Sequence, residues 1–148
     1  MSDSLIPEEA LKMIGMETGY GRPMKIEHGA LLKYAKSIKH PGYRNLDVNS
    51  ENTPLPMPLS FLLTNLESGI ERDFDIPLLV SHRVRGGDEL EMIELVYEGD
   101  TISANTKLIS LAEKQSKNGK MVLIETETLY KNQHGRIVLR GKTTIIKR

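Results

Sequence analysis

The sequence has no cysteine and no tryptophan, and it contains only two phenylalanines. Disulfide bonds and thiolate metal sites are therefore excluded. Because large aromatic residues are scarce, leucine, isoleucine, valine and methionine must supply most of the hydrophobic core. Neither sign of charge is in excess, since Lys+Arg and Asp+Glu both number 20 and the formal net charge is zero. This balance does not indicate a nucleic acid or an anionic membrane as the main partner.

Long hydrophobic runs are also missing. No apolar stretch approaches the roughly 20 residues that a membrane-spanning helix needs. The first residues include Asp3, Glu8 and Glu9 and lack the basic start and apolar run of a secretion signal. We therefore expect a cytoplasmic protein. The hydrophobic share of 39% and the charged share of 27% are ordinary for a globular protein, and 148 residues fit a single domain over residues 1–148.

The first half of the chain contains three helical patterns. Residues 4–15 predict a short helix, because Pro7 suits a first helical turn and Gly15 suits a helix end. Residues 29–38 predict a second helix with one apolar stripe, made of Leu31, Leu32, Ala35 and Ile38. Residues 58–69 are apolar nearly all round, at Leu59, Phe61, Leu62, Leu63 and Leu66. Such a helix should be buried.

The second half predicts strands. Residues 76–85 alternate Ile76, Leu78, Val80, His82 and Val84 on one face. Further strands are expected over residues 89–97, 100–115, 121–131 and 136–147. Asn118-Gly119 predicts a tight hairpin turn, and residues 132–135 predict a second turn. The expected fold class is therefore α+β, with a curved antiparallel sheet wrapped around one central buried helix.

Four stretches carry a resemblance to a known family. They are "IEHGALLKYAKSI", "LPMPLSFLL", "LVYEGDTISANTKLI" and "LIETETLYKNQHGRIVLRGKTTIIKR". In this order they resemble the MaoC-like acyl-thioester dehydratases, which have the hot-dog fold, and especially the N-terminal half of the fused double hot-dog forms. The resemblance covers residues 14–148.

The resemblance implies reversible addition of water to a 2-enoyl thioester of coenzyme A or of an acyl carrier protein. In that family an aspartate, and a histidine five positions later, bind and activate the water. Backbone N–H groups at the start of the buried helix stabilise the enolate oxygen. No cofactor and no metal are expected. The expected partners are the acyl thioester and a second hot-dog chain, in a homo- or heterodimer.

The catalytic pair is not found at its expected place. An alignment on "YAKSI" puts the aspartate position near Lys39 or His40 and the histidine position between Tyr43 and Asn45. No aspartate is followed five positions later by a histidine between Lys33 and Asp47. Pro56 and Pro58 also remove N–H donors near the start of the buried helix.

Several residues remain candidates for a site. His40, Tyr43 and His82 are candidates for catalysis, although His40 also suits a helix C-terminus and His82 also suits a buried, hydrogen-bonded position. The residues expected to bind substrate are Tyr43, Arg44, Asn45, Met57 and Phe61. The alternative for residues 43–45 is a loop or an interface.

Three functions stay open at this point. The favoured one is a non-catalytic hot-dog subunit that pairs with a catalytic MaoC-like chain and helps to form the acyl-CoA pocket of an enoyl-CoA hydratase or 3-hydroxyacyl thioester dehydratase. The second is a homodimeric acyl-CoA hydratase or thioesterase with atypical catalytic residues. The third is an acyl-CoA-binding scaffold without catalysis.

Overall fold

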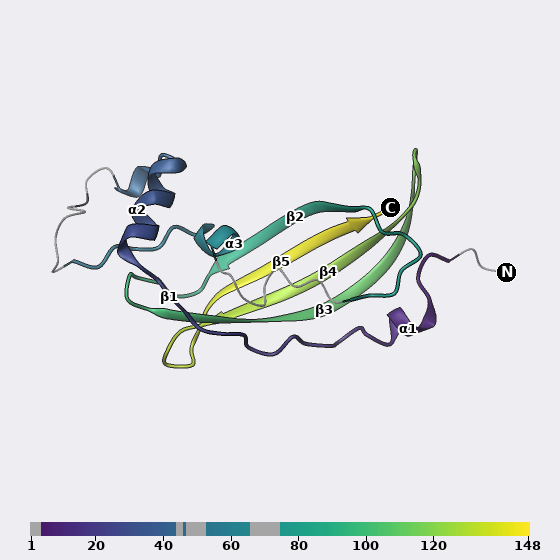
Figure 1. Cartoon of the computed structure of the whole chain (residues 1–148), viewed down its shortest axis with the longest axis horizontal. Helices are drawn as coiled ribbons and strands as arrows, with labels where there is room; N and C mark the ends of the chain where they lie inside the picture. The colour runs from purple at the N-terminus through teal and green to yellow at the C-terminus, as the bar shows by residue number, and fades with distance from the viewer. Residues whose placement is uncertain (1–3, 44–45, 47–52, 66–74) are drawn as a thin grey trace.

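A five-stranded antiparallel sheet with long, curved strands forms the main layer of the protein (Figure 1). The computed structural model describes residues 4–43, 46, 53–65 and 75–148. The strands are β1 (Met24–Lys25), β2 (Arg83–Met92), β3 (Thr101–Ser116), β4 (Gly119–Lys131) and β5 (Ile137–Lys147), in the spatial order β1-β3-β4-β5-β2. The predicted α+β class with a curved antiparallel sheet is confirmed.

Both predicted turns join neighbouring strands. Ser116 pairs with Gly119 at the β3–β4 turn, where Gly119 has a φ of 112°, a conformation that favours glycine. At the β4–β5 turn, the Asn132 side-chain oxygen accepts the N–H of His134 at 2.9 Å and the N–H of Arg136 at 3.1 Å. An asparagine that bonds its own following backbone in this way fixes the turn.

The helices differ from their patterns in their bounds: the first is shorter than predicted, and the second begins and ends one residue earlier. They are α1 (Glu8–Leu11), α2 (His28–Ser37), the 3-10 turn η1 (Pro41–Tyr43) and α3 (Phe61–Asn65). The α2 stripe buries Leu31 and Ala35, but Ile38 is 45% exposed, so its predicted place in the stripe is wrong. The reason is that α2 ends at Ser37, and Lys39 takes a left-handed φ of 52° that turns the chain away.

The central helix α3 is buried at its first two residues, and Leu63 is half-buried. Phe61 and Leu62 are each only 1% exposed, as predicted. Leu59 is 41% exposed because it precedes the first helical residue, so its predicted burial is wrong. Leu66 lies outside the described residues.

The strand predicted over residues 76–85 is wrong in its bounds. Residues 75–82 form no strand, and β2 starts at Arg83 and runs through Gly86 into the segment predicted from Glu89. The pairing register shifts between Arg85 and Gly87, which marks a bulge. A Cβ added at Gly86 would lie 3.0 Å from the Thr144 backbone oxygen, so glycine permits this close approach.

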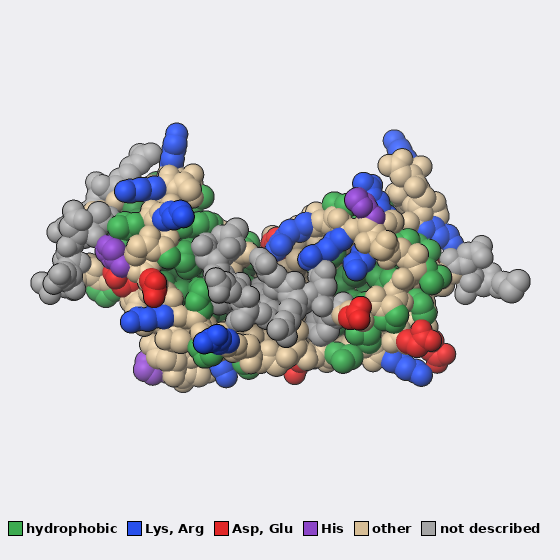
Figure 2. Space-filling model, in the orientation of Figure 1, with side chains coloured by type: hydrophobic (Ala, Val, Ile, Leu, Met, Phe, Trp, Pro, Cys, Tyr) green, Lys and Arg blue, Asp and Glu red, His purple; other side chains and the backbone are tan. Residues whose placement is uncertain are grey.

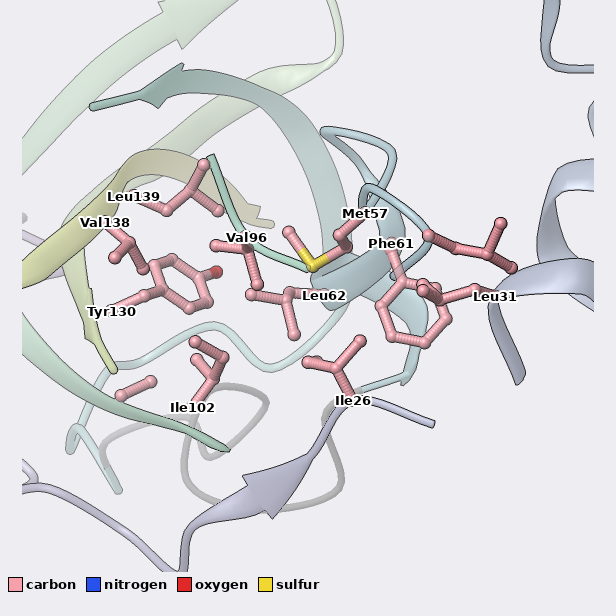
Figure 3. Close-up of a cluster of buried hydrophobic side chains, with 12 residues drawn as sticks. Ile26, Leu31, Met57, Phe61, Leu62, Val96, Ile102, Tyr130, Val138 and Leu139 are labelled. Carbon is pink, nitrogen blue, oxygen red and sulfur yellow. The ribbon is translucent and has the colours of Figure 1, made fainter. Parts of the chain in front are cut away.

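Two hydrophobic clusters cover one face of the sheet. The cluster at the α2 and α3 end is shown in Figure 3. It consists of Ile26, Leu31, Leu55, Met57, Phe61, Leu62, Val96, Ile102, Ala104, Tyr130, Val138 and Leu139. The cluster at the other end consists of Ala10, Ile76, Leu108, Val122, Ile124 and Ile145. Residues 75–80, although not a strand, contribute Ile76, Leu78 and Val80 to this second cluster.

The two edges of the sheet differ. The N-terminal segment runs along β3, with Gly15 N–H donating to Leu108 O at 2.8 Å and Thr18 N–H donating to Thr106 O at 2.8 Å (Figure 1). On the other side, β2 is the last strand of the sheet. In the part of the chain that the structure describes, no helix has the length and hydrophobicity to cross a membrane.

Candidate functional site

The site is predicted at the break after α2, where the helix ends and the η1 turn follows. His40 N–H donates to Ala35 O at 2.9 Å, which closes the helix end after the left-handed Lys39. Pro41 then starts the η1 turn, which ends at Tyr43. In Figure 1 this break and α3 lie at the same end of the sheet. Tyr34 within α2 contacts Phe61, the first residue of α3, so α2 lies against the start of the buried helix.

A cavity of about 410 Å³ lies against this break. It is lined by Leu32, Ala35, Lys36, Lys39, His40, Tyr43 and Leu46. The helix contributes apolar side chains to the lining, and two lysines and a histidine add polar groups. A mostly apolar pocket with a few polar groups is the usual form of a small-molecule site. Two of the predicted site residues, His40 and Tyr43, line this cavity.

Tyr43 fastens the η1 turn to the segment before α3. Its hydroxyl donates to Pro56 O at 2.5 Å. Burial, with a smaller contribution from the negative charge of Glu98, raises the pKa of Tyr43 to about 12. At neutral pH the hydroxyl therefore stays protonated, and its proton is already donated to the backbone. This geometry favours a structural role for Tyr43 over that of a general base.

His40 is half-buried beside Tyr43. The two rings have centroids 5.6 Å apart and an interplanar angle of 70°. His40 Nδ1 accepts the N–H of Gly42 at 3.1 Å, so this nitrogen is occupied by the turn. The other ring nitrogen, Nε2, is the atom of His40 left to act on a ligand in the cavity.

The remaining expected substrate-binding residues divide into two groups. Met57 and Phe61 belong to the buried cluster, at 4% and 1% exposed. Phe61 also contacts Tyr34, with ring centroids 5.5 Å apart. Met57 N–H donates to Val96 O at 2.8 Å. Arg44 and Asn45 lie outside the described residues, and their role stays a prediction.

His82 is not part of this site. The sequence predicts it on the buried face of a strand, but its side chain is exposed, so that prediction is wrong. His82 precedes β2 and exchanges backbone hydrogen bonds with Arg148, at 3.1 and 2.9 Å. The C-terminus and α2 lie at opposite ends of the sheet (Figure 1). The predicted strand was to start at Ile76, but β2 starts at Arg83, and this leaves His82 outside the strand and outside the core.

One carboxylate–imidazole pair, between Glu98 and His28, was not predicted from the sequence. His28 Nδ1 lies 3.1 Å from both carboxylate oxygens of Glu98, and Leu55 N–H donates to Glu98 Oε1 at 2.9 Å. The Leu55 hydrogen bond, followed by the His28 contact, lowers the pKa of Glu98. Glu98 thus joins the start of α2 to the segment before α3. Seventy residues separate His28 from Glu98, and no local pattern signals such a pair.

A second cavity, of about 630 Å³, lies over β2, β4 and β5. Glu89, Glu127 and Lys142 line it and are register partners across these strands. Their sequence neighbours Asp88, Thr126 and Thr143 line the cavity as well. It includes none of the predicted site residues. Among the residues described, no group of three or more His, Asp or Glu side chains is placed to hold a metal ion.

Solved structures share this fold. A chain of the ChsH1–ChsH2 complex from Mycobacterium tuberculosis is 16% identical, with a TM-score of 0.70 over 95% of this chain and 89% of that chain. A chain of the truncated HadBC (3R-hydroxyacyl-ACP dehydratase) complex from the same organism is 19% identical, with a TM-score of 0.67 over 90% and 96%. The R-hydratase PhaJ1 from Pseudomonas aeruginosa is 15% identical, with a TM-score of 0.65 over 90% and 81%.

These similarities confirm the predicted hot-dog fold, since MaoC-like dehydratases and R-hydratases are among the matching structures. A comparison with curated protein sequences finds no match. The family model described as the FAS1-like dehydratase domain region matches residues 12–140, which is most of the chain. The chain belongs to this FAS1-like dehydratase family and has the fold of the MaoC-like dehydratases.

Proposed function

We propose that this chain is the non-catalytic hot-dog subunit of an enoyl-thioester hydratase or dehydratase. A separate MaoC-like chain would supply the aspartate and the histidine, and this chain would help to form the acyl pocket. One observation carries the proposal: a cavity lies against the break after α2, where the resemblance implies the catalytic pair, but the sequence there has no Asp–x4–His pattern. The scaffold is thus kept without the groups that activate water.

The polar groups near α3 support the same proposal. An oxyanion site needs backbone N–H groups that are free to point at the substrate oxygen. Pro56 and Pro58 have none, and the N–H of Met57 is bonded to Val96 O. The hydroxyl of Tyr43 is likewise bonded to Pro56 O. The polar groups of Met57 and Tyr43 therefore serve the fold in preference to the reaction.

The edge of the sheet supports pairing with a second chain. After β2, the alternating residues Ile93, Leu95 and Tyr97 are 50%, 63% and 38% exposed. These residues lie in the segment that connects the edge strand β2 to β3, and exposed apolar side chains favour association. Two of the similar structures, HadBC and ChsH1–ChsH2, are themselves complexes of two differently named chains. We place the partner on this β2 edge.

The test is an assay of crotonyl-CoA hydration. The purified chain is measured alone, then mixed with a MaoC-like hot-dog chain that carries the Asp–x4–His pattern. We expect no turnover above background from this chain alone and an increase in turnover when both chains are present. Turnover by this chain alone that equals the mixture would exclude the non-catalytic role.

A homodimeric hydratase or thioesterase is the second candidate, because His40 lines the cavity. For that function, His40→Ala should abolish activity in a folded protein. His134→Ala is the matched control, since His134 is exposed in the β4–β5 turn. The third candidate is an acyl-CoA-binding scaffold. Stabilisation by acyl-CoA without turnover, and with no effect of any partner chain, would indicate that function.

A further inference from the structure

Three lysines form a line along α2 and its end. Lys33, Lys36 and Lys39 follow one another at three-residue spacing, and all three side chains are exposed. Three-residue steps keep side chains on neighbouring positions of one helix side. The helix itself contains no aspartate or glutamate. Figure 2 shows Lys and Arg side chains gathered over this end of the molecule.

Within the described part of the chain, these three positive charges are not neutralised by an acidic side chain. No ion pair there joins any of the three lysines to a carboxylate. Cations near a helix C-terminus do stabilise the helix through its dipole. This stabilisation is greatest in the last turn, so it does not require a line of three lysines. A surface with uncompensated positive charge attracts a negatively charged partner.

The lysine line lies directly beside the candidate site. Lys36 and Lys39 are part of the lining of the 410 Å³ cavity, next to the apolar Leu32 and Ala35. An apolar floor therefore opens onto a positively charged rim. A ligand that fits both parts has an acyl group for the floor and negative charge outside the mouth.

We propose that Lys33, Lys36 and Lys39 form a docking surface for an acidic carrier protein that presents the acyl thioester, whose acyl arm enters the cavity. The proposal rests on the acyl-thioester function proposed above. The three cations are exposed; Lys33 and Lys36 lie about one turn apart on α2, and Lys39 follows the end of the helix at Ser37. Such a row matches several carboxylates on a protein surface, whereas one phosphate group is usually held by donors that converge on it.

The experiment measures binding, so that it does not depend on activity. The probes are crotonyl-pantetheine, which is uncharged, crotonyl-CoA, and an acidic acyl carrier protein loaded with the crotonyl group. Each is titrated into the wild type and into K36E/K39E, at about 50 and about 300 mM salt. The control is K114E/K117E, which changes the net charge equally at exposed positions by the distant β3–β4 turn.

We expect K36E/K39E to weaken binding of the loaded carrier protein about tenfold or more at low salt. High salt should weaken carrier binding by the wild type several-fold. The control variant should bind the carrier like the wild type. Crotonyl-pantetheine should bind the wild type and K36E/K39E equally, because it carries no charge. If K36E/K39E does not fold, K36Q/K39Q replaces it, with an expected loss of about threefold.

Two results would overturn the docking surface. One is carrier binding that K36E/K39E leaves unchanged. The other is a loss for crotonyl-CoA as large as the loss for the carrier, which would assign the lysines to the phosphates of coenzyme A. Failure of the acyl-thioester function itself is distinguishable, because crotonyl-pantetheine would then not bind any variant.

Discussion

Glu98 connects three separate parts of the chain through one carboxylate. It accepts the N–H of Leu55 and lies within 3.1 Å of His28, and it belongs to the turn before β3. The N–H of Glu98 in turn donates to Leu55 O at 2.8 Å. The start of α2 and the segment before α3 are thereby held to the same point. This residue, which has no catalytic role in our account, positions the walls of the site.

The charge of Glu98 should therefore stabilise the fold in a pH-dependent way. Its pKa is lowered from the ordinary 4.5, so the stabilisation is present above that pH and is lost as the pH falls through the lower folded value. We expect Glu98→Gln to unfold at lower urea concentration than the wild type at pH 7. The difference between the two proteins should shrink as the pH is taken from 7 to 3 in urea titrations. A difference that stays constant over this range would show that the charge contributes nothing.

The hydroxyl of Tyr43 allows a second test at the residue scale. Tyr43→Phe removes the hydrogen bond to Pro56 O and leaves that oxygen without this donor. The expected loss is about 1 kcal/mol of unfolding free energy. Tyr97→Phe is the control, because Tyr97 is partly exposed and its ring is kept. Equal stabilities of the two variants would contradict the structural role given to Tyr43.

Individual contacts of the site were the part least open to prediction from sequence. His40 and Tyr43 were found because a helical pattern ends at His40-Pro41-Gly42, and the structure brings both to one cavity. The His28–Glu98 pair depends on tertiary packing between distant segments, so nothing in the local sequence predicts it. His82 was misplaced because alternation continues through residues that do not form a strand.

At the scale of elements, the bulge in β2 depends on Gly86. Gly86→Ala would place a Cβ 3.0 Å from Thr144 O and 3.2 Å from the Thr144 methyl group. Backbone must move to relieve this contact, so we expect a loss of about 1–3 kcal/mol in denaturant unfolding. Gly87→Ala is the matched control, because a Cβ there meets no atom within 4 Å. If the two alanine variants were equally stable, the close approach of Gly86 to Thr144 O would not require glycine.

The order of the elements was predicted better than their number or extent, since β2 replaces two predicted strands and β1 was not predicted. The hairpins follow from Asn118-Gly119 and from Asn132 to Gly135, where turn chemistry is local. The interrupted strand at residues 75–82 does not follow, because its apolar residues pack on the second cluster without pairing. Alternating apolar residues indicate which side chains are buried, and in this segment they are buried without forming a strand. For α3, the apolar content predicted burial correctly at Phe61 and Leu62, but the helix starts later than Pro58.

At the scale of the whole molecule, the account places a partner chain on the β2 edge. Leu95, in the segment that follows β2, is 63% exposed, and Leu79, before β2, is 69% exposed. We expect Leu95→Glu to weaken association with the catalytic chain about tenfold or more, because a charge would be buried in the interface. Leu79→Glu should associate like the wild type. Both variants should melt close to the wild-type temperature when alone, and equal association of the two would contradict the placement.

The fold and the family were open to prediction because their signals are spread over the whole chain. The order of the four resembling stretches agrees with the family match over residues 12–140. The partner, the carrier of the acyl group and the cytoplasmic location stay predictions, since they depend on other molecules.

We propose above all that this chain helps to form an acyl-thioester site but does not itself activate water. The most direct measurement is the rate of crotonyl-CoA hydration by the wild type and by His40→Ala, each alone and free of any other hot-dog chain. The account predicts that both proteins give the uncatalysed rate. A wild-type rate well above that background, which His40→Ala then abolishes, would contradict it.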